Sequence, residues 1–90
     1  MNEGYQDDIR VATSTAIASA ATTDELLHQI AQIATEHGVS DWESEDATFI
    51  AIGEGMREAG LAEADVRKRA SMIAGGNAAA EEKILTGFRV

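Results

Sequence analysis

The sequence predicts an all-α protein, a compact bundle of four to five short helices that forms a single domain over residues 1–90. Along most of the chain, apolar residues recur at intervals of three and four, which is the spacing of one helical face. Glycines and capping residues divide this pattern into short segments, and proline is absent. One short stretch alternates as a strand would, but no second strand pattern exists to pair with it.

The first helix is predicted over about residues 7–21. Ile9, Ala16 and Ile17 follow helical spacing, and Asp7 lies in the first turn, where the helix dipole stabilises negative charge. The serines and threonines here are indifferent helix formers, and the middle of the segment is the stretch that alternates. Because a lone strand would have no partner, we predict a helix.

The second predicted helix has the clearest boundaries. Thr22 and Glu25 match a capping box, in which each side chain accepts a hydrogen bond from the other residue's backbone N–H. Gly38 ends the helix, and His37 lies in its last turn, where the dipole favours a cation. Five residues form a continuous apolar stripe between these ends: Leu26, Leu27, Ile30, Ile33 and Ala34.

The third predicted helix begins at a second capping signal, either Ser40 with Glu43 or Ser44 as a competing N-cap. Four apolar residues share one of its faces: Phe49, Ile52, Met56 and Ala59. Gly53 and Gly55 interrupt the interior at a cost of about 1 kcal/mol each relative to alanine. Such glycines indicate either a close approach of another helix or a point where the helix bends.

Two more helices complete the prediction. The fourth runs from about residue 62 to Gly75, and the fifth, capped by Asn77, covers residues 78–86 with Gly87 just beyond its end. We expect residues 1–6 and 89–90 to be flexible, as chain ends often are. The connections are short, so sequential helices should pack antiparallel or as corners, and no linker separates domains.

The composition limits both the core and the location of the protein. Much of the 44% hydrophobic content is alanine, which buries little area per residue, and cysteine is absent, which excludes disulfides and thiolate metal sites. No apolar run approaches the roughly 18 residues that cross a bilayer. Since the first residues are acidic and polar, unlike a signal peptide, we expect a cytoplasmic protein without membrane contact.

Charge is distributed unevenly along the chain, whose formal net charge is −9. Residues 1–65 hold fourteen acids and two bases, a net −12, whereas residues 66–90 hold five bases and two acids, a net +3. A polyanion such as DNA would be repelled by most of this surface. Nucleic acid is therefore a less favoured partner than a protein with a basic surface.

No motif of a catalytic or cofactor site is complete. Gly53 and Gly55 could open a dinucleotide fingerprint, but Glu58 stands where the third glycine belongs and no strand precedes it. His28 and His37 are nine residues apart and do not share a helical face, so we expect both to be solvated surface residues. We predict no enzyme activity, no cofactor and no metal ion.

A calcium loop is also excluded by spacing. Counted from Asp41, the sixth position is Asp46 instead of glycine, and the twelfth is Ile52 instead of glutamate. The acids of this segment have two other interpretations: an anionic helix start, or a contact surface with the tryptophan as an anchor. The candidate partner-binding residues are Asp41, Trp42, Glu43, Glu45 and Asp46.

Our leading hypothesis is a small acidic interaction module, an adaptor, inhibitor or regulatory protein that docks to another macromolecule. One alternative is a helix-turn-helix regulator formed by residues 56–73, whose phosphate contacts would be Arg67, Lys68 and Arg69. Against it, Glu63 and Asp65 lie where bases would be read, and the pairs Glu63–Arg67 and Asp65–Arg69 account for the same charges. A further alternative is a self-associating structural component, a homodimer with its seam around Gly53.

Overall fold

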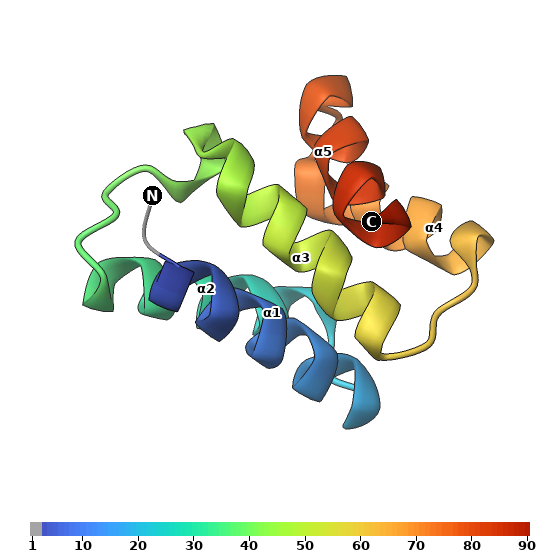
Figure 1. The fold of residues 1–90 in the computed structure, drawn as a ribbon, viewed down its shortest axis with the longest axis horizontal. Helices are drawn as coiled ribbons and strands as arrows, with labels where there is room; N and C mark the ends of the chain where they lie inside the picture. Colours follow the sequence, from blue (N-terminus) through green and yellow to red (C-terminus); the bar gives the residue numbers. More distant parts are fainter. Residues whose placement is uncertain (1–2) are drawn as a thin grey trace.

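The computed structural model describes residues 3–90 and confirms the all-α prediction. Over these residues it contains five α-helices, one 3-10 turn and no strand (Figure 1). In chain order the elements are α1 (Glu3–Ala18), α2 (Thr23–Glu36), η1 (Trp42–Ser44), α3 (Asp46–Glu58), α4 (Glu63–Ala74) and α5 (Ala78–Arg89). Among them, no helix is both long enough and apolar enough to cross a membrane.

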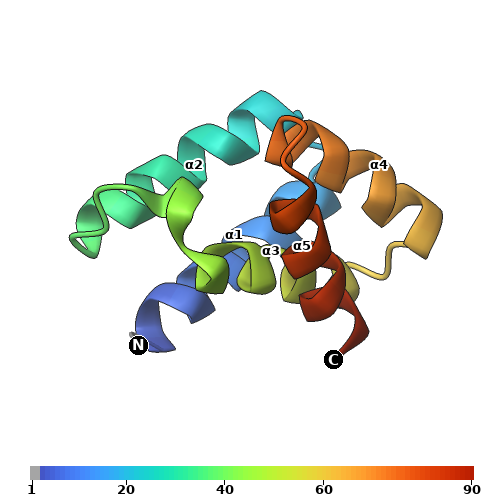
Figure 2. The ribbon, with the colours of Figure 1, turned by 90° about the horizontal axis from the view of Figure 1, so that it is seen from above.

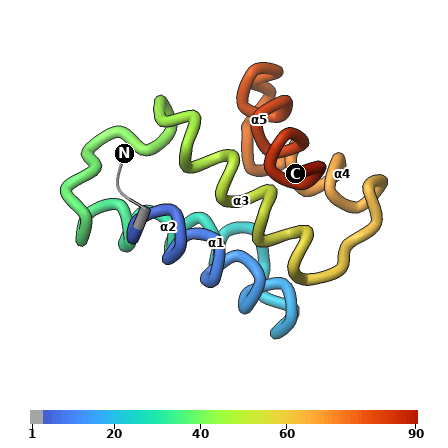
Figure 3. Tube along the Cα trace, in the orientation of Figure 1, coloured from blue at the N-terminus to red at the C-terminus, as the bar shows by residue number. Residues whose placement is uncertain are grey.

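α3 is the central helix of the bundle. It packs against α5 on one side and against α1 on another, while α2 lies along α1 and α4 packs on α5 and touches α2. Figure 2 shows α2 and α4 together on one side of α3, with α5 crossing it, and the trace in Figure 3 shows how short the connections are. The two ends of α2 therefore lie at different parts of the surface.

The crossing of α3 and α5 is so close that only glycine fits. A Cβ added at Gly53 would lie 1.9 Å from the carbonyl oxygen of Ile84, and one added at Gly87 would lie 2.0 Å from the carbonyl oxygen of Ile50. Gly87 was predicted to follow the last helix, but α5 continues through it to Arg89. The reason is this packing, which places Gly87 inside the interface with α3.

The crossing of α3 and α1 is built in the same way. A Cβ at Gly55 would lie 2.6 Å from the carbonyl oxygen of Arg10 and 2.6 Å from the Cβ of Thr13. Close helix approach, one of the two interpretations of the interior glycines, is therefore the correct one. Because α5 already covers the face around Gly53, a homodimer seam has no open surface there.

The core joins all five helices, and among the side chains whose burial is described it contains two buried polar ones. Thr13 donates its hydroxyl to the carbonyl of Ile9 at 2.8 Å, and Thr48 shares a 2.6 Å hydrogen bond with the hydroxyl of Tyr5. No buried side-chain nitrogen or oxygen in the described part of the chain lacks a partner. The largest fully buried apolar side chains are Tyr5, Ile9, Ile30, Ile52, Met56, Val66 and Ile84.

The ends of the chain differ from the prediction. α1 begins at Glu3 and ends at Ala18, instead of covering residues 7–21, because Tyr5 is 1% exposed and anchors the first turn on α3. At the other end, Arg89 belongs to the last turn of α5 and is ion-paired, while Val90 is 72% exposed. Residues 3–6 and Arg89 thus belong to helices, the flexibility expected of the two chain ends stays a prediction, and Met1 and Asn2 lie outside the described residues.

Candidate functional site

The five candidate partner-binding residues lie together at the connection between α2 and α3. We call residues 41–46 the acidic turn; it comprises η1, its flanking residues and the start of α3. Asp41, Glu43 and Asp46 are exposed, and Glu45 is half-buried. The fifth residue, Trp42, is half-buried as well. Their role in partner binding stays a prediction, and the sequence did not indicate how the segment is held.

Trp42 fixes the acidic turn to the body of the protein. Its ring packs against Phe49 of α3 with the centroids 6.0 Å apart and the planes tilted by 51°, and it lies against the apolar core. Part of the Trp42 ring is thus buried within the protein, so less of it is exposed to a partner than we expected of an interface anchor. Its contact with Phe49 instead determines where the neighbouring carboxylates stand.

Backbone hydrogen bonds hold the acidic turn in a compact shape. The N–H of Ser44 donates to the carbonyl of Asp41 at 3.1 Å, and that of Glu45 donates to the carbonyl of Trp42 at 3.1 Å. The predicted N-cap at Ser40 or Ser44 is wrong: Glu45 precedes α3 without a side-chain cap. The Ser44 hydroxyl does not cap α3 because it donates to Asp41 Oδ2 at 2.6 Å. By contrast, the capping box of Thr22 and Glu25 forms as predicted.

The acidic turn has few basic neighbours among residues 3–90. Lys83 of α5 lies 3.8 Å from Asp46, and both side chains are largely exposed, so the pair is weak. Glu43 and Glu45 take part in no ion pair within the described chain. The turn therefore presents carboxylates that the protein itself does not neutralise.

Beneath the acidic turn, three helices meet around Tyr5. Its ring contacts His37 edge-on with the centroids 5.5 Å apart, and His37 Nε2 lies 2.8 Å from Asp8 Oδ2. Burial raises the pKa of the Tyr5 hydroxyl; the hydrogen bond to Thr48 partly offsets this, and the negative charge of Glu45 adds to it. His37 is therefore a packed residue of the α1–α2 contact and not the solvated one we expected. The sequence hid this role because α1 was predicted to begin after Tyr5.

The three basic residues of the helix-turn-helix alternative do not act as one group. Arg67 is ion-paired with Glu63 at 3.1 Å, as the i,i+4 spacing predicted, whereas the described chain shows no pair between Asp65 and Arg69. Lys68 and Arg69 line a pocket next to the N-terminus of α2. In addition, α4 packs on α5 and α2 and hardly on α3, so α3 and α4 do not form a packed pair.

Glu63 connects the two C-terminal helices. Besides Arg67 it accepts a hydrogen bond from Arg89 at 3.3 Å, which ties the start of α4 to the end of α5. The Arg89 hydrogen bond first, and then that of Arg67, lower the pKa of the Glu63 carboxyl. Glu63, which the helix-turn-helix alternative places where bases would be read, is thus a structural contact between α4 and α5.

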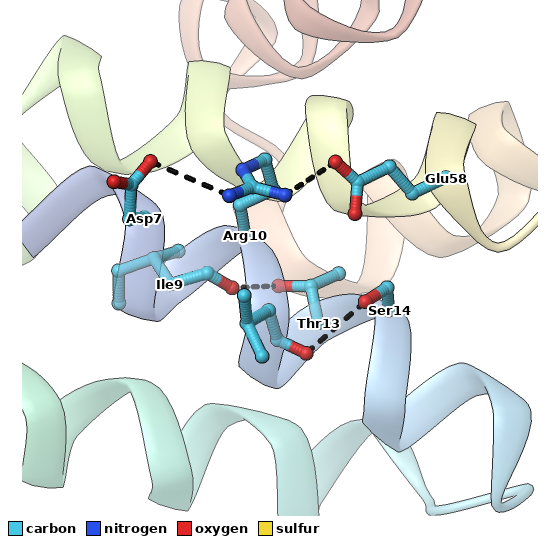
Figure 4. A network of polar contacts seen from close by, with 7 residues as sticks. Asp7, Ile9, Arg10, Thr13, Ser14 and Glu58 are labelled. Atoms are coloured by element: carbon cyan, nitrogen blue, oxygen red, sulfur yellow. Dashed lines mark hydrogen bonds and ion pairs between the residues drawn. The ribbon is translucent and has the colours of Figure 1, made fainter.

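A second polar network, which the sequence did not reveal, ties α1 to α3 (Figure 4). Arg10 donates to Glu58 across the two helices and to Asp7 within α1, the latter at 3.4 Å. The hydrogen bond with Glu58 raises the pKa of the Arg10 guanidinium. Only the short spacing from Asp7 to Arg10 could have been seen in the sequence, since Glu58 is 48 residues away.

The pockets on the surface of the described chain are shallow and open. In the described range no group of three or more His, Asp or Glu side chains is arranged to hold a metal ion. His28 is exposed on α2, nine residues before His37 and in the middle part of the helix. The chain matches no protein-family model, no curated protein and no solved structure. The acidic turn is consequently the surface that the geometry distinguishes best.

Proposed function

We propose that this protein is a non-enzymatic interaction module, an adaptor, inhibitor or regulatory protein, which docks to a basic surface of another protein through its acidic turn. The observation that supports this most directly is the presentation of Glu43 and Glu45 as unneutralised carboxylates on a hydrogen-bonded turn. A surface held in one conformation loses little entropy on binding, which favours affinity.

Electrostatics support the same function. The acidic turn follows Glu36, at the end of α2, and the adjacent His37 lies 2.8 Å from Asp8 of α1, so acids of α1 and α2 add negative charge to the segment that leads into the turn. Such a field accelerates encounter with a basic partner and disfavours acidic ones. The chain's net charge of −9 acts in the same direction at longer range.

Affinity capture from the source cell tests the proposal. The wild-type chain is compared with Glu43→Lys, which reverses one carboxylate of the turn, and with Glu82→Lys, which makes the same charge change on an exposed part of α5. We expect a basic protein to be captured by the wild type and by Glu82→Lys but to be lost with Glu43→Lys. The helical circular dichroism should be the same for all three proteins.

Two outcomes would remove the proposal. If Glu43→Lys captures the same partner with unchanged affinity, the acidic turn is not the docking surface. If both charge reversals weaken capture equally, the binding depends on net charge alone and no particular surface is responsible.

A further inference from the structure

A second charged surface lies at the other end of α2. A shallow pocket of about 420 Å³ separates the N-terminus of α2 from α4. We call it the basic groove, and it is lined by Ala21, Thr22, Thr23, Leu61, Asp65, Lys68, Arg69 and Met72. Lys68 is exposed, and Met72 is 53% exposed although it is apolar. The groove thus combines positive charge with uncovered apolar surface.

The basic groove brings together cationic side chains that form no ion pair over residues 3–90. Four of the seven Lys and Arg residues take part in ion pairs over residues 3–90: Arg10, Arg67, Lys83 and Arg89. Of the other three, Lys68 and Arg69 both line the groove, and only Arg57 lies elsewhere. Asp65 is the single acid in the lining, so the groove retains a positive balance.

α2 joins the basic groove to the acidic turn. It has 14 residues and is therefore about 21 Å long, at 1.5 Å per residue. Its dipole is positive at the groove and negative toward the acidic turn, in the same sense as the side-chain charges. Because the two surfaces lie at opposite ends of one rigid helix, they cannot meet within one molecule but are complementary between two.

We infer that a second copy of this chain is a partner of the acidic turn, whose Glu43 and Glu45 dock against Lys68 and Arg69 in the basic groove of the next copy. The inference rests on the proposed function, since it names a second copy of the chain as the partner of the same acidic turn. The contact joins two different patches, so it is head-to-tail and leaves a free surface at each end of the assembly.

The net charge of −9 gives this association a distinctive salt dependence. At about 0.01 M salt the screening length is about 30 Å, comparable with the molecule's dimensions of 33 × 27 × 23 Å, so whole molecules repel each other. At about 0.15 M it falls to about 8 Å, and only the facing charges interact. At about 1 M even these are screened. Association should therefore be strongest at intermediate salt.

Sedimentation velocity of the full chain at these three salt concentrations, over a range of protein concentrations, tests the inference. We expect dimers and longer assemblies at intermediate salt only. Glu43→Lys/Glu45→Lys and Lys68→Glu/Arg69→Glu should each lower the association constant about tenfold or more, since each removes two charge pairs and introduces repulsion. Asp65→Asn, which removes the opposing charge from the groove, should strengthen association.

Mixing the variants gives the sharpest control. Each double variant alone should be monomeric, because its turn and its groove then carry charges of equal sign. In a mixture of the two, the intact acidic turn of Lys68→Glu/Arg69→Glu meets the intact groove of Glu43→Lys/Glu45→Lys, and the two reversed surfaces are also of opposite charge, so association should return. A mixture of Lys68→Glu/Arg69→Glu with wild type should instead end the assemblies at the variant and shorten them. A monomer at all salt and protein concentrations would overturn the inference, as would assemblies that persist in both double variants.

The two proposals fail separately. Capture of a basic protein that Glu43→Lys abolishes, by a chain that sediments as a monomer, refutes the second copy as partner and supports the proposed function. Self-association that depends on Lys68 and Arg69 but not on Glu43 and Glu45 overturns the inference, because the groove then takes another surface of the second copy, whereas the proposed function is decided by the capture experiment. Binding of duplex DNA that Lys68→Glu/Arg69→Glu abolishes, by a monomeric chain, assigns the groove to phosphate and also overturns the inference.

Discussion

At the crossings of α3 with α1 and α5, backbone meets backbone, whereas at the two ends of α2 charged side chains face solvent. Gly53 and Gly87 leave no room for a methyl group, because a carbonyl oxygen occupies the place of each missing Cβ. Gly38, at the end of α2, has nothing within 4 Å of an added Cβ. The comparison separates a fixed frame from its surfaces: substitutions in the frame should lower stability, and substitutions at the ends of α2 should alter binding.

The largest expected effect is that of Gly53→Ala. Its methyl group would meet the carbonyl oxygen of Ile84, and since backbone cannot rotate away, α3 and α5 must separate. We expect the free energy of unfolding to fall by about 3 kcal/mol or more, as measured by urea denaturation. Gly38→Ala is the matched control: it has φ of +74° but open space, so only the left-handed backbone is strained, at about 1 kcal/mol.

Equal losses for these two variants would contradict the close crossing. They would mean that the left-handed backbone conformation at position 38 costs as much as the contact at position 53. The comparison between the fixed frame and the open ends would then have no basis in packing.

A medium effect is expected from Tyr5→Phe, which removes the hydroxyl that α1 contributes to the buried pair with Thr48. The Thr48 hydroxyl would remain buried without its partner, so the free energy of unfolding should fall by about 1–2 kcal/mol. In Tyr5→Phe/Thr48→Val both partners are apolar, and the double variant should lose less than the sum of the single losses. Additive losses would show that the two hydroxyls do not depend on each other.

The same residue offers a spectroscopic measurement in the wild-type protein. Tyr5 is the only tyrosine, so the absorbance of tyrosinate reports its ionisation alone. Because burial raises the pKa of this hydroxyl, folded protein should ionise at higher pH than denatured protein. Stability should thus be complete below the ordinary tyrosine pKa of about 10 and be lost as pH rises through the folded value. Coincident titration curves for folded and denatured protein would contradict the burial of Tyr5.

The helices were predictable from sequence wherever local chemistry decided their ends. The capping box at Thr22 and the N-cap at Asn77 are local signals, and both form. The start of α1 was missed because it depends on Tyr5 reaching Thr48, a contact across 43 residues. The end of α5 was missed for a similar reason, since Gly87 resembles a helix stop until α3 is seen to pack against it.

The acidic turn was found from composition, but its structure was not. A run of acids with one tryptophan is visible in any reading of the chain, whereas the packing of Trp42 on Phe49 depends on the turn between them. The basic groove could not be predicted from the sequence. It brings Lys68 and Arg69 next to Thr22, and spacing within α4 says nothing about a residue at the start of α2.

The smallest expected effect concerns Glu63, which lies between the frame and the surfaces because it ties exposed parts of α4 and α5 together. Its pKa is lowered in the folded protein, first by the hydrogen bond from Arg89 and then by that from Arg67. A lowered folded pKa means that the unfolded chain binds a proton more readily, so Glu63 contributes stability above its unfolded pKa and loses it as pH falls through the folded value.

Glu63→Gln should therefore be less stable than wild type at neutral pH, and the difference should shrink as the solution is acidified. The difference should be smaller than that of Tyr5→Phe, because these charges are exposed and screened, and it should decrease at high salt. Glu82→Gln, at an exposed acid with no ion pair over residues 3–90, is the control and should follow wild type. A Glu63→Gln difference that is constant from neutral to acidic pH would show that the side chain acts through packing and not through its charge, and would place Glu63 with the frame.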